Sequence, residues 1–153
     1  MGGSTFDVSL VNIKNNEIYK VKYTSGDTHL GWEDFNQKLV DYCVQEFCSK
    51  NSFEEEEVKK NKKALKRLKI ACEKSKILLS ISTEITIYVD NFYNDETLYI
   101  KVTRAKFEDL CKNLFSKLTS PIEEVINKAN IGINDIQEVV LVGGSTRIRK
   151  LKK

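Results

Sequence analysis

The 153-residue sequence lacks the features that mark several common classes of protein. It has one histidine and no Cys-x-x-Cys pair, so no ligand spacing of a zinc site is present. No apolar run approaches the roughly 20 residues that a membrane-spanning helix needs. The first residues are polar and lack the basic-then-apolar order of a signal peptide. From these absences we expect a cytoplasmic protein that holds no metal site and binds no membrane.

Neither sign of charge dominates the chain. The 25 basic and 22 acidic residues leave a net charge of +3, an excess too small to indicate nucleic acid as the main partner. Hydrophobic residues make up 41% and charged residues 31%, as in an ordinary globular domain. Four cysteines could form two disulfides, but Cys43 and Cys48 share one apolar helical stripe, where cysteine behaves as a small hydrophobe. We therefore predict that Cys43, Cys48, Cys72 and Cys111 are buried, reduced thiols.

Alternation and helical periodicity predict an α/β chain of nine elements. Residues 5–14 and 17–24 alternate as strands around an Asn-Asn turn, and a Ser-Gly-Asp break follows. Residues 84–91 and 97–103 form a second predicted hairpin. Helices are predicted around 35–48, from 55 to 80, after the cap Thr103, and again from the cap Ser120 through Pro121 to Ala129. The apolar run at 137–142 predicts a strand covered on both faces, which completes the order ββ–α–α–ββ–α–α–β.

A glycine motif lies at each end of the chain. Residues 2–7 read Gly-Gly-Ser-Thr-Phe-Asp and lead into the first strand, and residues 143–147 read Gly-Gly-Ser-Thr-Arg after the last one. Glycine allows backbone N–H groups to approach an anion, and a helix N-terminus adds a favourable dipole. Neither motif fits the P-loop or the dinucleotide pattern. Taken alone, each motif is better explained as a turn, because glycine pairs usually mark turns.

Five segments together resemble the DnaK-type (seventy-kilodalton heat-shock) chaperones, in family order and at family spacing. They are Gly-Gly-Ser-Thr-Phe-Asp-Val-Ser at 2–9, Gly-Asp-Thr-His-Leu-Gly at 26–31 with Glu-Asp-Phe at 33–35, Ala-Cys-Glu-Lys-Ser-Lys at 71–76, Thr-Arg-Ala-Lys-Phe-Glu at 103–108 and Leu-Val-Gly-Gly-Ser-Thr-Arg-Ile at 141–148. The resemblance implies an actin-like ATPase fold with a ribonuclease H-like core, in which two lobes close over Mg-ATP. Residues 1–153 would be part of the second lobe, truncated at both ends, with an outer αβ subdomain at about 31–129.

The resemblance also assigns roles by matching positions. Thr5 would be catalytic, together with Asp7 near the water shell of magnesium. The implied nucleotide contacts are Gly2, Gly3, Ser4, Thr5, Glu73, Lys76, Ser80, Gly143, Gly144, Ser145 and Arg147. Glu73, Lys76 and Ser80 would hold the ribose and adenine, and their spacing of i, i+3 and i+7 independently places them on one helical face. That spacing alone favours a surface Glu-Lys pair, and the family resemblance reverses this preference.

The sequence departs from the family at four positions. Ser4 stands at a glycine position, where its Cβ would crowd the phosphates if the backbone needed a positive φ. Trp32 also replaces a glycine, and its charged neighbours predict an indole that is at least partly exposed, although a buried anchor for the next helix is the alternative. Ile77 replaces an arginine that stacks on adenine, a contact worth about 0.5–2 kcal/mol. Arg149 replaces a proline.

In the family, a strand ending in Asp-Leu-Gly precedes the first glycines, further helices follow the last motif, and the first lobe supplies a phosphate-contacting lysine. We therefore expect a fragment of an ATP-dependent, stress-related protein-folding chaperone, with ATP or ADP and Mg as ligands and no ATPase activity by itself. Its partners would be nucleotide, nucleotide-exchange factors and other co-chaperones, and the remainder of the chaperone chain. The alternatives are a non-catalytic module that binds co-chaperones, and a degenerate, non-functional product. Actin-like sugar kinases fit less well, because they lack the signature at 26–35.

Overall fold

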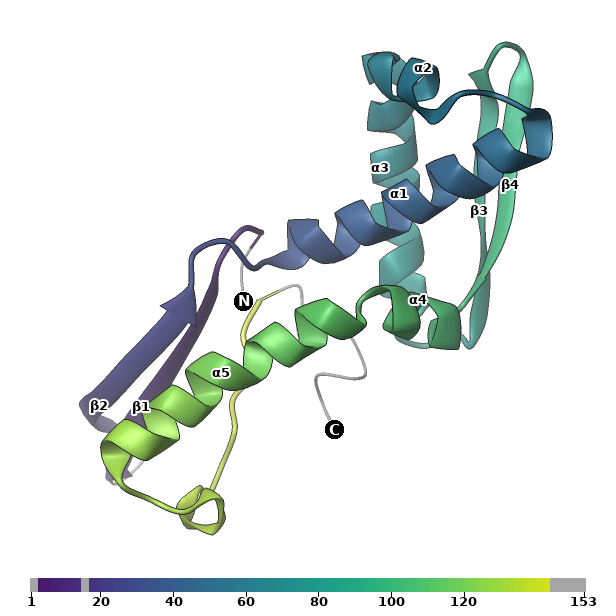
Figure 1. Cartoon of the computed structure of the whole chain (residues 1–153). Coiled ribbons are helices and arrows are strands. Elements are labelled where there is room, and N and C mark those ends of the chain that lie inside the picture. Colours follow the sequence, from purple (N-terminus) through teal and green to yellow (C-terminus); the bar gives the residue numbers. More distant parts are fainter. Residues whose placement is uncertain (1–2, 15–16, 144–153) are drawn as a thin grey trace. The chain divides into compact units, whose positions relative to one another are not determined.

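The computed structural model describes residues 3–14 and 17–143 of the chain (Figure 1). Its elements are β1 (Phe6–Lys14), β2 (Glu17–Asp27), α1 (Trp32–Asn51), α2 (Glu55–Lys60), α3 (Lys62–Leu78), β3 (Glu84–Tyr93), β4 (Glu96–Thr103), α4 (Arg104–Leu110), α5 (Lys112–Ala129) and a 3-10 helix (Ile133–Asp135). The strands form two antiparallel pairs, β1 with β2 and β3 with β4. The predicted α/β class is therefore confirmed.

The described chain divides into two compact units. The first unit consists of residues 3–33 and 113–143, and the second of residues 34–112. Helix α1 begins in the first unit and continues into the second. Each unit is described by itself below.

In the first unit, helix α5 lies along the β1–β2 hairpin (Figure 1). The Ser25 hydroxyl on β2 donates a hydrogen bond to Glu124 on α5. Strand β2 runs through the Ser-Gly-Asp segment that the sequence predicted as a break, and there Gly26 pairs with Asp7. A Cβ at Gly26 would lie 2.4 Å from the carbonyl oxygen of Phe6, so the strand continues because this residue has no side chain.

The predicted helix start at Ser120 is wrong. Helix α5 runs without interruption from Lys112 to Ala129 with Pro121 inside it, and the break falls earlier, at Cys111. The buried residues of α5 recur every three or four positions: Leu114, Leu118, Pro121 and Val125. Because the proline ring belongs to this buried stripe, its packing offsets the backbone hydrogen bond that proline removes.

The predicted last strand is also absent from the described chain. Residues 137–142 have no regular structure, and Val139, Val140, Leu141 and Val142 are between 44% and 72% exposed. A continuous apolar run forms a covered strand only where neighbouring strands and layers meet it. The described part of the first unit has one two-stranded sheet, and no strand in it pairs with this run.

The second unit holds most of the core. One face of the β3–β4 hairpin is buried, and α3 packs against β3. On each strand the buried residues alternate with exposed ones such as Tyr88 and Tyr99. The side chains at the heart of this unit are Phe35, Leu39, Val40, Cys43, Val44, Phe47, Leu68, Cys72, Ile87, Leu98 and Val102. This alternation confirms the second predicted hairpin, whose turn is shorter than expected, with a positive φ at Asn94 and Asp95.

The helix predicted over residues 55–80 is two helices. The side chain of Asn61 accepts a hydrogen bond from the Ala64 N–H at 3.0 Å and starts α3 as a new N-cap. Val58 of α2 is fully buried, which fixes the short first helix against the rest of the unit. Thr103 caps α4 as predicted, because its hydroxyl accepts from the Lys106 N–H at 3.1 Å.

Candidate nucleotide site

The phosphate segment, residues 3–7, enters β1 in the first unit. The carbonyl oxygen of Gly3 accepts a hydrogen bond from the Glu33 N–H at 2.8 Å, so the first turn of α1 is joined to this segment. Gly31 lies against the same backbone, where a Cβ would be 2.3 Å from the Gly3 oxygen and 2.5 Å from the Ser4 Cα. Two motifs that are far apart in sequence therefore pack together in the first unit, through Gly3 and Ser4 of one and Gly31 and Glu33 of the other. Glycine is needed at residue 31 for this close approach.

The side chains of the phosphate segment differ in exposure. Ser4 and Asp7 are exposed and Thr5 is half-buried. Ser4 is not among the described residues with a positive φ, so its Cβ causes no backbone strain. Gly143, by contrast, has a φ of 101°, a conformation that favours glycine. The other predicted contacts at the ends of the chain, Gly2, Gly144, Ser145 and Arg147, lie outside the described residues, as does Arg149.

The predicted adenosine contacts lie in the second unit, at the end of α3. Glu73 is exposed, whereas Lys76 is 1% exposed. The helix ends at Leu78, so Ser80 lies in the following turn, where its N–H donates to the Ile77 carbonyl at 3.1 Å. The expectation that all three side chains share one helical face is therefore wrong. The helix positions Glu73 and Lys76, and a separate turn positions Ser80.

The hydroxyl oxygen of Ser80 is buried and has no hydrogen-bond partner in the structure. Leaving a buried polar group without a partner costs about 1–3 kcal/mol. Such groups are rare in native proteins, and each one indicates strain or a partner that is supplied from outside the chain. Ser80 is therefore the predicted contact whose surroundings most favour a ligand.

Arg104 is a positioning residue that sequence reasoning missed. Its Nε donates to the Leu79 carbonyl and its Nη2 to the Ser82 carbonyl, both at 2.7 Å, and its N–H donates to the Thr83 carbonyl at 2.8 Å. Arg104 thus holds the turn on both sides of Ser80. The sequence feature that could have indicated this role is the position of Arg104 in the motif at 103–108, directly after the helix cap Thr103.

Two substituted positions have contrasting environments. Ile77 is 36% exposed on α3, so its side chain reaches the surface. Trp32 is 8% exposed, and the expectation of a partly exposed indole is wrong. The helix begins at Trp32 itself, and Trp32, Phe35 and Leu39 lie three and four residues apart on one buried face. Burial of that face decides the position of the indole, and its charged neighbours point elsewhere.

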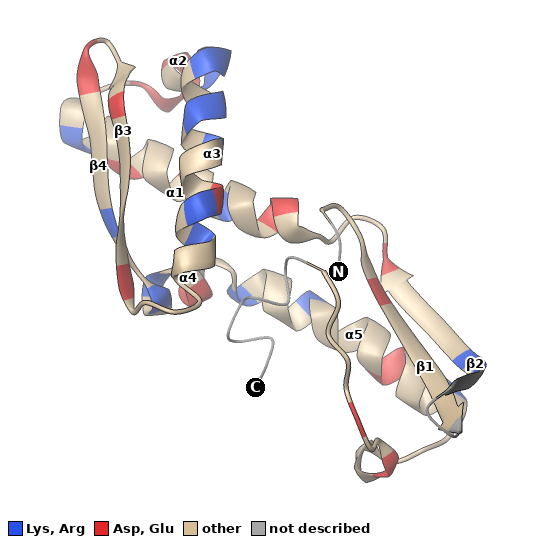
Figure 2. Ribbon diagram, turned by 180° about the vertical axis from the view of Figure 1, so that it is seen from behind, with Lys and Arg blue, Asp and Glu red and all other residues tan. Residues whose placement is uncertain are grey.

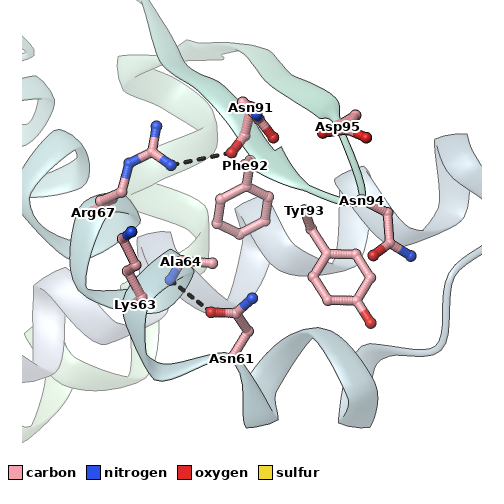
Figure 3. Close-up of a pocket in the computed structure, with 9 residues that line it drawn as sticks. All are labelled: Asn61, Lys63, Ala64, Arg67, Asn91, Phe92, Tyr93, Asn94 and Asp95. Atoms are coloured by element: carbon pink, nitrogen blue, oxygen red, sulfur yellow. Dashed lines mark hydrogen bonds between the residues drawn. The ribbon is translucent and has the colours of Figure 1, made fainter.

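A separate pocket opens at the other end of α3 and contains none of the predicted nucleotide contacts. It has a volume of about 450 Å³. The residues that line it are Asn61, Lys63, Ala64, Arg67, Asn91, Phe92, Tyr93, Asn94 and Asp95 (Figure 3). Arg67 crosses one side of it, where its guanidinium donates to the carbonyl oxygens of Asn91, at 3.1 Å, and Asp90. Lysines are spread along the same helix (Figure 2), which makes the surface of α3 basic.

Over residues 3–14 and 17–143, no three side chains of histidine, cysteine, aspartate or glutamate lie close enough to hold a metal ion. No helix in the described part of the chain has the length and apolar character needed to cross a membrane.

The whole chain is similar to proteins of one family. The family model described as Hsp70 protein matches residues 1–153. Over all 153 of its residues, the chain is 44% identical to a heat shock 70 kDa protein of Neurospora crassa, and the matched region is 23% of that relative's length. Two further relatives also match the full chain. The identity is 42% to heat shock cognate 70 kDa protein 3 of Dictyostelium discoideum and 44% to a ribosome-associated molecular chaperone of Zygosaccharomyces rouxii, and the matched region is 24% of the length of each relative.

Proposed function

The chain belongs to the Hsp70 family and covers a fragment of that family's ATPase domain, and we propose that it supplies two sets of contacts to an ATP site. The phosphate set comprises the segment at 3–7 together with the glycines at 143–144. The adenosine set comprises Glu73, Lys76 and Ser80. Its ligand is ATP or ADP with Mg, and the complete chaperone supplies the remaining groups.

The observation that carries the proposal is the buried hydroxyl of Ser80, which has no hydrogen-bond partner. A ribose or adenine nitrogen or oxygen would satisfy it and remove the cost of leaving it unpaired. Glu73, a member of the same adenosine set, lies seven residues before Ser80. Its exposed carboxylate accepts hydrogen bonds from the ribose hydroxyls. Arg104 keeps the Ser80 turn in place before any ligand binds, which lowers the entropic cost of binding.

The phosphate set acts through backbone N–H groups and one hydroxyl. Residues 3–5 present donors to phosphate oxygens, and Thr5 adds its O–H. Asp7 is exposed, and its carboxylate would accept hydrogen bonds from the waters that a bound Mg²⁺ retains. Phosphoryl transfer needs groups that converge on the phosphate from several directions. The fragment alone therefore binds nucleotide weakly and does not hydrolyse it.

The test is a titration of the isotope-labelled chain followed by amide chemical shifts, with three ligands. Adenosine is expected to shift the amides of residues 73–82, pyrophosphate with Mg those of residues 3–7, and ADP with Mg both sets. Ser80→Ala is expected to weaken the adenosine response. Ser82→Ala is the matched control, because the Ser82 hydroxyl is already satisfied by the Glu84 carbonyl at 2.7 Å. Absence of shifts in both segments at saturating ADP, or equal losses in the two variants, contradicts the proposal.

A second candidate function is docking of a nucleotide-exchange factor or another co-chaperone on the second unit. Tyr88 and Tyr99 favour it, because they lie directly opposite each other on the exposed face of β3–β4. Exposed aromatic side chains are common anchors at protein interfaces. Measured affinity for an exchange factor is expected to fall with Tyr88→Ser and to be unaffected by Ile122→Ser on α5 in the first unit. Equal affinity of both variants contradicts docking at this face.

A further inference from the structure

The pocket at the start of α3 contains none of the proposed nucleotide contacts. Its volume of about 450 Å³ lies within the range of sites that hold small molecules. The residues that line it belong to the first half of α3, to the cap before that helix, and to the end of β3 and the turn after it (Figure 3). Glu73, Lys76 and Ser80 lie toward the opposite end of α3 or just beyond it. A ligand in this pocket therefore occupies a second site.

Contacts within the second unit hold the walls of the pocket in place. The guanidinium of Arg67 on α3 donates to the carbonyl oxygens of Asn91, at 3.1 Å, and Asp90 on β3. The buried ring of Phe92 packs edge-on against Phe47 of α1, with the ring centroids 4.9 Å apart. Because these contacts exist without a ligand, binding has to order few side chains.

One side of the pocket presents hydrogen-bond donors that the fold leaves available. The side-chain oxygen of Asn61 accepts from the Ala64 N–H at 3.0 Å, so its amide N–H groups remain as donors. Lys63 is exposed, and over residues 3–14 and 17–143 its ammonium has no ion pair or hydrogen bond. Arg67 spends two N–H groups on the strand carbonyls and retains others. Two cations and an amide donor thus line one cavity, whose acidic lining residue is Asp95 in the β3–β4 turn.

We propose that this pocket binds a phosphate monoester, with the phosphate at Lys63 and Arg67. Ammonium and guanidinium groups are the usual side-chain ligands of phosphate. A phosphate monoester carries a charge of about −1.5 to −2 at neutral pH, which matches two cations better than a single carboxylate does.

The rest of the pocket accommodates the body that carries the phosphate. The cavity is much larger than a phosphate ion, and Asn91 and Asn94 line it beyond the two cations. Each asparagine side chain offers both N–H donors and a carbonyl acceptor, which suits hydroxyl and amide groups of the ligand. A sugar phosphate and a phosphorylated side chain of a peptide share this chemistry.

The test is a titration of the isotope-labelled chain followed by amide chemical shifts, with glucose 6-phosphate and a short phosphoserine peptide as probes. A phosphate ester is expected to shift the amides of residues 61–67 and 91–95, and the probe with the stronger response identifies the source of the phosphate. Glucose and the unphosphorylated peptide are expected to leave these amides unchanged. Added salt is expected to weaken the response, because the charges are exposed.

Three variants test the assigned contacts. Lys63→Gln removes one cation and is expected to weaken binding roughly three- to tenfold. Lys66→Gln is the matched control, because Lys66 is exposed on the same helix and does not line the pocket, and it is expected to weaken binding less than about twofold. Asn61→Asp retains an acceptor for the helix cap but puts a negative charge in place of the amide, so binding is expected to be lost while circular dichroism shows an intact helix.

Several results would overturn the proposal. One is that neither probe shifts residues 61–67 and 91–95, or that the shifts are confined to residues 3–7. Another is that glucose or the unphosphorylated peptide gives the same response as its phosphorylated form. Equal losses of affinity in Lys63→Gln and Lys66→Gln overturn the contact with Lys63, and equal affinity for inorganic phosphate overturns the assignment to an ester.

Discussion

Replacing Arg104 with alanine tests how the turn that carries Ser80 is held in place. The substitution removes two hydrogen bonds, from Nε to the Leu79 carbonyl and from Nη2 to the Ser82 carbonyl, each 2.7 Å long. A hydrogen bond from a charged group contributes about 1.5–3 kcal/mol. Because Arg104 is partly exposed, solvent replaces some of that interaction, and we expect the free energy of unfolding to fall by about 2–4 kcal/mol.

Arg67 provides a matched comparison for this prediction. It also donates to two backbone carbonyl oxygens, of Asn91 and Asp90, but it is exposed. Water replaces both bonds at low cost in Arg67→Ala, so this variant is expected to lose less than about 1 kcal/mol. The two arginines therefore share a bonding pattern and differ in burial.

Urea unfolding of both variants measures these losses, and amide hydrogen exchange locates them. In Arg104→Ala, the N–H groups of Ile81 and Ser82, which both donate to the Leu78 carbonyl, are expected to exchange faster. In Arg67→Ala they are expected to keep the wild-type rate. If Arg104→Ala unfolds within about 0.5 kcal/mol of wild type, or if the two variants lose equal stability, the arginine does not hold this turn.

Three further perturbations follow from the packing and charges of the two units. Gly31→Ala places a Cβ 2.3 Å from a backbone oxygen, and urea unfolding is expected to show a loss of about 1–3 kcal/mol in the free energy of unfolding. In the control Gly132→Ala, the nearest neighbour of the new Cβ is a side-chain oxygen at 3.3 Å, and the expected loss is less than about 0.5 kcal/mol. Equal losses in the two variants would contradict the close approach at Gly31. Ile77→Arg places a cation on an exposed part of α3 and is expected to tighten ADP binding by roughly two- to thirty-fold by calorimetry, and unchanged affinity would mean that adenine does not stack there. The hydrogen bond from Lys128 lowers the pKa of Glu124 below its ordinary value, so the contribution of this carboxylate to stability is present at neutral pH and disappears as the pH falls through that lowered pKa. Glu124→Gln is expected to flatten the acid side of the stability profile, and an unchanged profile would refute this assignment.

Local signals in the sequence predicted the features that depend on few neighbours. Thr103 caps α4 because a hydroxyl and the N–H three residues later are enough to form the cap. The β3–β4 hairpin follows from alternation, because one face packs on α3 and the other is exposed. The burial of Cys43, Cys48, Cys72 and Cys111 was predicted from their stripes and is confirmed.

The helix boundaries that failed depend on tertiary packing. Pro121 after Ser120 has the local pattern of a helix start, but its ring lies in the buried stripe of α5 and the helix continues through it. Asn61 carries a cap that the long charged run around it concealed. In both places, the packing of the unit selected one of two boundaries that the local sequence permits.

The sequence assigns residues to the candidate site but does not predict how they are arranged. The positions of Glu73, Lys76 and Ser80 come from family motifs, and helical spacing suggested one shared face. The end of α3 at Leu78 separates Ser80 from that face, and the spacing contains no information about where the helix stops. Arg104 contacts backbone carbonyl oxygens, which every residue type provides, so no pattern of residue types in the sequence predicts these contacts.

The unequal cores of the two units explain why the prediction of the last strand is wrong and the prediction of the β3–β4 hairpin is correct. Among the side chains that the structure describes in the first unit, the buried apolar ones are Leu30, Trp32, Leu114, Leu118, Pro121 and Val125, and none of these belongs to β1 or β2. A hairpin needs one covered face, which α3 supplies to β3–β4 in the second unit. An all-apolar strand needs two covered faces and paired edges, and the described part of the first unit supplies one helix and one hairpin. The run at 139–142 is thus a sequence suited to a larger sheet than the one described, in agreement with a chain that spans 23% of its Neurospora crassa relative.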